Sequence, residues 1–240
     1  MLYRTPRIGP EERRVSKAIG ALWRRMQSKS LAHPPKWSGL TARMLRARAI
    51  RGSNSIEGHF VSAEDAMEAV IGGEPQDARP ADWDAVVHYR EAMDYALAQS
   101  QSEDFAYSKD LIRGLHFVMM RHETTKRPGL WRPGPIYVTG ASGGVVYTGP
   151  DAERVPDLMA ELVEWLESTE DRASIAAAMA HLNLVRIHPF SDGNGRMSRC
   201  LQTLVLARAG VFDPAFASIE EYLGRNTQAY YAALEAVSGD

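Results

Sequence analysis

The sequence lacks several features that mark particular classes of protein. Among its 240 residues there is one cysteine, Cys200, which excludes an internal disulfide framework and any zinc site built from cysteines. Nothing approaches the run of about 18 apolar residues that indicates a membrane span, and the opening stretch MLYRTPRIGPEERR contains no apolar run of a secretory signal. The formal net charge of −2 gives no overall attraction to nucleic acid or to an anionic membrane. We therefore expect a soluble, cytoplasmic protein with neither nucleic acid nor membrane as a partner.

What the chain does have is helical periodicity over most of its length. Apolar residues recur at helical spacing, and the 45% hydrophobic content is that of an ordinary globular protein. Helices are expected over residues 11–28, 41–58 and 63–71, after Asp82, after Ser108, from Pro156, over 171–186, from Arg196 to Gly210, and once or twice beyond. His88, His116 and His181 fall inside these patterns and are interpreted as packed rather than catalytic. The predicted fold class is mainly α, a helical bundle.

One stretch, residues 129–150, breaks the helical period. Residues 136–139 and 145–148 are β-branched and aromatic runs on either side of a Gly-Ala-Ser-Gly-Gly segment, which predicts a β-hairpin. An isolated two-stranded hairpin is marginally stable in water, so it must lean on the helices. Its edges are also able to accept an extended segment of a partner chain, although a purely structural hairpin fits the sequence equally well.

Residues 188–199, HPFSDGNGRMSR, hold more chemistry than packing requires. Pro189 and the Gly-Asn-Gly run predict a tight loop over residues 188–195 that opens onto a helix starting at Arg196. The N–H groups of such a turn and of the helix N-terminus form an anion site, and Arg196 and Arg199, three residues apart, add two guanidinium forks. Phe190 is expected to anchor the loop in the core. The pattern favours a polyphosphate ligand.

Two further side chains in this loop suggest chemistry at that ligand. Asp192 is placed to hold Mg²⁺, which takes few carboxylates and otherwise binds phosphate oxygens and water. His188 is able to accept a proton from a hydroxyl near neutral pH. Each residue alone has a simpler structural interpretation: His188 would cap a helix, Asp192 would form an Asx turn and the arginines would be solvated. Their concentration within twelve residues favours a ligand-binding site instead.

This stretch resembles the signature of Fic-domain proteins, HPFx[DE]GNGRxxR, at every defined position. Those positions are His188, Pro189, Phe190, Asp192, Gly193, Asn194, Gly195, Arg196 and Arg199. The resemblance implies a Fic-type bundle and transfer of AMP from ATP, with Mg²⁺, to a hydroxyl of a target protein. It implies His188 as general base, Asp192 on the metal, and Gly193, Asn194, Gly195, Arg196 and Arg199 on the phosphates, with the Asn194 side chain as a donor. The hairpin, residues 136–148, would be the family's flap, which presents the target segment.

A second, looser motif lies near the N-terminus. The segment from Ser53 to Gly58 resembles [ST]xxxE[GN], the inhibitory helix motif of many Fic proteins. In physical terms, Glu57 would pair bidentately with Arg199 and compete with the γ-phosphate of ATP for the same guanidinium group. An ordinary solvated glutamate is the alternative. Near the C-terminus, the family's tyrosine beside the adenine suggests Tyr231, with Asn226 as a second candidate contact.

We therefore expect two parts, an N-terminal helical region over residues 1–75 that folds onto the core and contains the inhibitory helix, and a Fic core over residues 76–240. The predicted function is an autoinhibited protein adenylyltransferase, which also acts on itself. Two alternatives stay open: removal of AMP from a modified protein by the same site, and a non-catalytic, nucleotide-responsive interaction module. The target protein, the choice of nucleotide and the oligomeric state are not set by the sequence.

Overall fold

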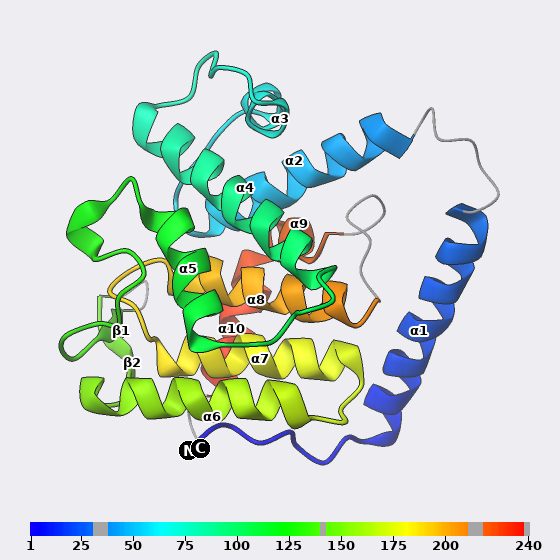
Figure 1. Ribbon diagram of the computed structural model, residues 1–240, viewed down its shortest axis with the longest axis vertical. Helices are drawn as coiled ribbons and strands as arrows, with labels where there is room; N and C mark the ends of the chain where they lie inside the picture. Colours follow the sequence, from blue (N-terminus) through cyan, green and yellow to red (C-terminus); the bar gives the residue numbers. More distant parts are fainter. Residues whose placement is uncertain (31–37, 140–142, 211–217, 238–240) are drawn as a thin grey trace.

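The computed structural model describes residues 1–30, 38–139, 143–210 and 218–237, which form a bundle of helices with one β-hairpin (Figure 1). The helices are α1 (Pro10–Ser30), α2 (Ser38–Ile56), α3 (Ala63–Ile71), α4 (Pro80–Ser100), α5 (Lys109–Met120), α6 (Val155–Ser168), α7 (Ala173–Ile187), α8 (Asn194–Arg208), α9 (Ile219–Arg225) and α10 (Thr227–Ala236). Two short 3₁₀ helices, η1 (Thr124–Lys126) and η2 (Ala152–Arg154), and the strands β1 (Tyr137–Thr139) and β2 (Val145–Thr148) complete them. The predicted mainly α fold with one hairpin is confirmed.

The centre of the bundle is the pair α7 and α8. As its continuous apolar sequence predicted, α7 has buried residues around most of its circumference, and α8 is buried along nearly all its length. Helices α4, α5 and α6 pack around this pair, and α2 crosses it near one end (Figure 1). The chain between α7 and α8 therefore leaves and re-enters the middle of the protein, which fixes both ends of that connection.

Several helix ends follow from local sequence. Ser62 and Ser108 cap α3 and α5, because each hydroxyl accepts a hydrogen bond from a backbone N–H three residues on. The expectation that Asp82 precedes its helix is wrong, since α4 begins at Pro80 and Asp82 lies in its first turn. There the buried carboxylate of Asp82 accepts a hydrogen bond from Arg79 Nε at 2.7 Å.

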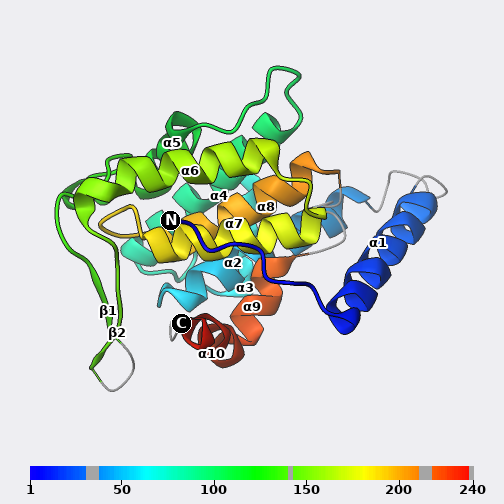
Figure 2. The ribbon, with the colours of Figure 1, turned by 90° about the horizontal axis from the view of Figure 1, so that it is seen from below.

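The hairpin projects from the bundle (Figure 2) and is attached at its base. β1 and β2 pair antiparallel, with Tyr137 opposite Thr148. The Gly149 N–H donates to Ile136 O at 3.0 Å, and the Tyr147 hydroxyl donates to Arg186 O at the end of α7. Residues 140–142, inside the predicted hairpin, lie outside the described residues. The start of β1 and the end of β2 thus lie at the base of the hairpin, beside α7.

The N-terminal region is only partly folded onto the core. Residues 1–9 run along α7, where the Asn183 side chain accepts a hydrogen bond from the Tyr3 N–H at 2.7 Å. Helix α2 packs on the bundle, but α1 lies to one side of it (Figure 1), and its apolar residues Val15, Ile19 and Leu22 are about half exposed. Helix α1 touches the core through Ser16, whose Oγ lies 3.4 Å from Ser174 Oγ, and the folding of the whole region onto the core stays a prediction. Within the described part of the chain, no helix is long and apolar enough to cross a membrane.

Helices α2 and α9 meet through their backbones. A Cβ atom placed on Gly224 would lie 2.8 Å from the Cα of Gly52, and one placed on Gly52 would lie 2.6 Å from the carbonyl oxygen of Glu220. Side chains are therefore excluded at this crossing. The C-terminal end of α2, which carries the predicted inhibitory motif, is held directly against α9.

Candidate active site

The loop between α7 and α8 is shorter than predicted. Helix α7 ends at Ile187. The next residue, His188, has a left-handed backbone with φ of 48°, and Gly193, with φ of 73°, precedes the first residue of α8. The predicted loop over residues 188–195 is thus corrected to 188–193, with Asn194 and Gly195 in the first turn of α8. The unpaired N–H groups of that turn face the same region as the loop, which is the arrangement of an anion site.

The Asn194 side chain has a structural task that the sequence did not indicate. Its Oδ1 accepts a hydrogen bond from the Phe190 N–H at 2.9 Å, and its Nδ2 donates to Phe190 O at 2.9 Å. These bonds use the amide oxygen and one of the two Nδ2 hydrogens, so the side-chain donor to phosphate stays a prediction, beside the backbone N–H of Asn194. Phe190 is fully buried, as predicted, and anchors the loop.

Arg132 holds the loop from outside it. Its backbone N–H donates to Pro189 O at 2.9 Å, and its Nε donates to His188 O at 2.8 Å. The two remaining guanidinium nitrogens donate to Gly134 O at 2.6 Å and to Pro150 O. One buried side chain therefore joins the strained residue His188 to both sides of the hairpin base. Sequence reasoning missed it, because no spacing pattern tells which carbonyl groups a lone arginine will meet.

His116 supports the other end of the loop. Its Nδ1 accepts a hydrogen bond from the Gly129 N–H at 2.9 Å, so the proton is on Nε2, which donates to Asp192 O at 3.0 Å. The ring stacks on Phe190 with 3.6 Å between ring centroids. Burial lowers the pKa of His116 to about 4. His116 is thus a packed, neutral histidine, and its contact with the loop is the part that helical periodicity did not indicate.

His188 itself is prepared to accept a proton. Its Nδ1 donates to Val185 O at 3.1 Å, which places the ring proton on that nitrogen and leaves Nε2 with a lone pair. Burial lowers the pKa of His188 below its usual value, since a charged imidazolium is poorly solvated there. The imidazole is therefore neutral near pH 7.

Asp192 is the carboxylate expected to bind a metal ion. Its Oδ1 accepts from the Gly193 N–H at 2.6 Å, and its Oδ2 lies 3.4 Å from Nζ of Lys126, a neighbour that the sequence did not indicate. In the described part of the chain no three acidic, histidine or cysteine side chains gather as a metal cage. One partly exposed carboxylate beside an anion site nevertheless fits Mg²⁺ that arrives on phosphates, because this ion keeps water and phosphate ligands.

The two arginines of the motif differ in their surroundings. Arg199 is buried and donates from Nε to Ser53 Oγ at 2.9 Å, and from Nη2 to Ser53 O at 3.0 Å and to Glu57 Oε1 at 2.7 Å. The predicted pairing with Glu57 is present, but through one carboxylate oxygen rather than two. Burial acts to lower the pKa of Arg199, but the nearby negative charge of Glu57 outweighs it and raises that pKa above the usual value. The buried Nη1 has no hydrogen-bond partner among the described residues.

Arg196 is also buried, but its guanidinium makes few contacts. Nη2 lies 3.2 Å from the Met120 sulfur, while Nε and Nη1 have no partner among the residues that the structure describes. Burial lowers the pKa of Arg196. Two buried guanidinium nitrogens without hydrogen-bond partners beside the loop are costly without a ligand.

The end of α2 sets the position of Glu57. The His59 N–H donates to Asn54 O at 3.0 Å and the Gly58 N–H donates to Ser55 O at 3.2 Å, a Schellman ending in which Gly58 has φ of 84°. Glu57 is thus the last residue before the left-handed turn. A Cβ atom on Gly195 would lie 2.3 Å from Glu57 Oε1. The carboxylate therefore occupies the N-terminus of α8, where an anionic ligand would bind.

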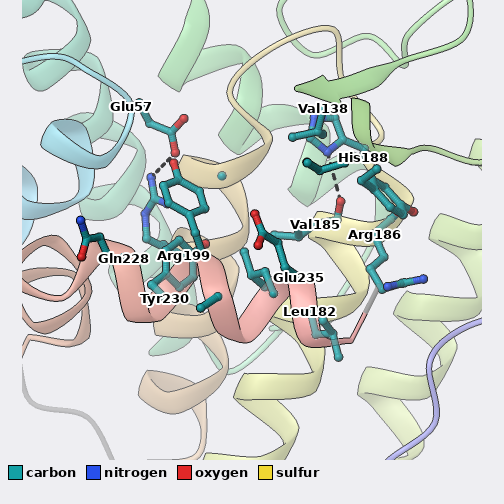
Figure 3. A pocket seen from close by; sticks show the side chains of 16 residues that line it. Glu57, Val138, Leu182, Val185, Arg186, His188, Arg199, Gln228, Tyr230 and Glu235 are labelled. Carbon is teal, nitrogen blue, oxygen red and sulfur yellow. Dashed lines mark hydrogen bonds and ion pairs between the residues drawn. The ribbon is translucent and has the colours of Figure 1, made fainter. Parts of the chain in front are cut away.

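Part of the predicted site meets in one cavity of about 600 Å³ (Figure 3), although Asp192 and Arg196 are not among the residues that line it. Glu57, His188, Gly195, Arg199 and Tyr231 all line it, together with hairpin and α10 side chains. The Tyr231 hydroxyl donates to Ile56 O at 3.2 Å, which ties α10 to the end of α2.

Of the two candidate adenine contacts, only Tyr231 lies at the cavity. Asn226 is exposed, does not line it, and donates from Nδ2 to Tyr222 O at 2.8 Å. His181 is packed, as expected. It accepts a hydrogen bond from the Tyr230 hydroxyl at 2.8 Å, and burial lowers its pKa to about 4.

Comparison with known proteins agrees with this geometry. Residues 106–206 match the Fic/DOC family. The chain is 40% identical over 110 residues to the protein adenylyltransferase Fic of Aedes aegypti, covering 45% of this chain and 21% of that protein. The protein of the same name from Culex quinquefasciatus is 39% identical over 110 residues, again 45% of this chain and 21% of that one. The chain thus spans about a fifth of the length of these relatives.

Solved structures extend the likeness to almost the whole chain. A Fic family protein from Desulfovibrio desulfuricans superposes with a TM-score of 0.80 at 26% identity, covering 98% of this chain and 69% of that one. A Fic domain containing signaling protein from Bacteroides thetaiotaomicron has the same fold, with a TM-score of 0.75 at 22% identity and coverage of 91% and 80%. The resemblance first found in twelve residues is therefore confirmed, and the chain contains a domain of the Fic/DOC family.

Proposed function

We propose that this protein is an adenylyltransferase, which transfers AMP from ATP to a serine, threonine or tyrosine hydroxyl of a target protein. The observation that carries the proposal is the single cavity that brings the neutral imidazole of His188 together with the buried guanidinium of Arg199 and the N-terminus of α8. A base that can take a proton and an anion site for phosphates are the two requirements of this reaction. The names of the relatives point to the same chemistry.

In this proposal the target hydroxyl oxygen attacks the α-phosphorus of ATP while Nε2 of His188 takes the hydroxyl proton. The bond from the α-phosphorus to the bridging oxygen breaks, and pyrophosphate leaves. Backbone N–H groups of Gly193, Asn194 and Gly195 hold phosphate oxygens at the helix N-terminus. Arg199 binds the distal phosphates, with Arg196 as a second buried positive charge.

Asp192 would hold the Mg²⁺ bound with ATP, and the ion would supply positive charge against the negative charge that develops on the phosphates. An outer edge of the hairpin, whose residues Tyr137, Val145 and Val146 are exposed, would align an extended segment of the target beside His188.

We further propose that the enzyme is inhibited by its own Glu57. The contact of Glu57 with Arg199 and its place over Gly195 support this, because the γ-phosphate would need both positions. Removal of the carboxylate should therefore raise activity.

One observation keeps the reverse activity as a second candidate. Glu57 Oε2 has no hydrogen-bond partner among the described residues, and the carboxylate faces the same cavity as His188. A free carboxylate oxygen could orient a water molecule toward a bound AMP ester and release AMP. For a non-catalytic module, by contrast, the prepared imidazole would have no use.

The test is incubation with ATP labelled on the α-phosphate and Mg²⁺. We expect weak self-labelling of the wild type, strong labelling of Glu57→Gly, and none for His188→Ala. Because His188 must be neutral and burial lowers its pKa below the usual value of about 6.5, the labelling rate should rise with pH in the acid range and already be level at pH 6.5. Absence of labelling in every variant would contradict the transferase, and release of AMP from a modified protein that requires Glu57 would favour the reverse reaction.

A further inference from the structure

A second cavity lies on the opposite face of α2 from the nucleotide cavity. It has a volume of about 630 Å³ and is an open cavity lined by α2, the connection to α3, α3 itself and α9; α2 packs on both α3 and α9 (Figure 1). Met44, Arg48, Arg51 and Ser55 of α2 line it at helical spacing. Ser53 binds Arg199 from the reverse face of the same helix. This volume falls within the range of small-molecule sites.

One part of the lining of this cavity is apolar. Ala47, Val61 and Ala66 line it and are each less than a tenth exposed. Phe60, which is 64% exposed, and Met44, which is 41% exposed, extend this apolar lining to the surface. An apolar body would therefore be favoured inside.

The mouth of the cavity is positively charged. Arg48 and Arg51 form no ion pair within the described residues, and Arg51 uses its Nε to donate to Val61 O at 3.0 Å, leaving its outer nitrogens free to bind. On the facing wall Arg225 is paired with the carboxylate of Glu221 at 2.6 Å, so these two charges cancel. The guanidinium groups of Arg48 and Arg51 remain, and two such groups three residues apart suit a phosphate group.

We infer that this cavity is a second ligand site, which takes a small phosphate monoester with an apolar body. The apolar part of the lining would bury the body and the two guanidinium groups would bind the head group. A ligand here would press on Gly52 and Ser55, one turn from Glu57. If the proposed inhibition by Glu57 holds, a ligand in this site also changes the affinity of the nucleotide cavity for ATP. The binding itself does not rest on the proposed function, whereas this coupling does.

Binding is tested by fluorescence titration with 1-naphthyl phosphate in the presence of saturating ADP and Mg²⁺, which blocks the nucleotide cavity. We expect saturable binding that is at least tenfold weaker for Arg48→Glu, which reverses a charge at the mouth, and for Met67→Trp, which fills the cavity. Arg43→Glu, an exposed position of α2 outside the cavity, is the matched control and should bind normally. Circular dichroism and ADP binding show that each variant is folded.

Equal binding by all these variants, or displacement of the probe by ADP, would overturn the inference. So would equal affinity for inorganic phosphate or for 1-naphthol, since each lacks one half of the proposed ligand. The second step is measured as ATP affinity with and without the probe, in the wild type and in Glu57→Gly. A change in the wild type alone supports it, whereas no change in either refutes the coupling and leaves the binding site established.

Discussion

Replacement of Glu57 by alanine gives the most direct test of the proposed inhibition, through ATP affinity rather than turnover. The carboxylate is joined to Arg199 by one charge-assisted hydrogen bond of 2.7 Å, and its side chain is 28% exposed. Such bonds contribute about 1.5–3 kcal/mol when well shielded, and partial exposure reduces this to about 1–2 kcal/mol. Because the γ-phosphate must displace the carboxylate, Glu57→Ala should tighten ATP binding about 5- to 30-fold.

The measurement is isothermal titration of ATP and of ADP, each with Mg²⁺, into the wild type, Glu57→Ala and the control Glu64→Ala. ADP has no γ-phosphate, so its affinity should change by less than about twofold, since the broken contact gives it nothing to gain. Glu64 is exposed on α3 and outside the cavity, and its variant should match the wild type. An equal gain for ATP and ADP, or none for ATP, would refute the competition between Glu57 and the γ-phosphate.

Three further predictions concern stability and backbone geometry. Arg132→Ala should lower the free energy of unfolding in urea by about 2–5 kcal/mol, because it leaves buried carbonyl groups without donors; a loss below 1 kcal/mol would contradict its place as the loop's main support. Gly58→Ala and Gly72→Ala each put a Cβ on a left-handed residue with open space around it and should each cost about 1–2 kcal/mol. Only the change at Gly58 should also tighten ATP binding, and equal ATP affinities would count against the role of that turn. His116 and His181 are neutral in the folded protein, with pKa values near 4, whereas the unfolded chain takes up protons below about pH 6.5. Stability should therefore fall between about pH 6.5 and pH 4, by about 3 kcal/mol for each histidine, and a flat unfolding profile over this window would contradict their burial.

The sequence was sufficient for features set by local pattern. Helical periodicity identified most of the bundle, and the glycines and proline of residues 188–195 identified the loop. The motif around Glu57 predicted its contact with Arg199, because each of these residues belongs to a short sequence motif of the family. The division of the chain at residue 75 stays a prediction.

What the sequence could not supply are contacts between residues far apart in the chain. Arg132 meets the loop 56 residues away, and no periodicity encodes which carbonyl groups it meets. The hydrogen bonds of the Asn194 amide with Phe190 were not predicted, because the composition of a loop does not show which of its side chains bond its own backbone. Asn226 was expected at the adenine by resemblance alone, whereas its side chain donates a hydrogen bond to Tyr222 O, four residues earlier. For α1, the amphipathic pattern predicted a helix with an apolar face, but it does not tell which surface that face packs against.

The backbone contact of Gly52 with Gly224 has a consequence for nucleotide choice. With no side chain between them to absorb a displacement, α2 cannot shift at this crossing without moving α9. Helix α10 follows α9 immediately and carries Tyr231, which lines the nucleotide cavity. A movement that withdraws Glu57 therefore reshapes the wall expected to contact the base. We expect relief of inhibition and base selectivity to change together, so that an activated variant differs from the wild type in its preference between ATP and GTP as well as in its rate.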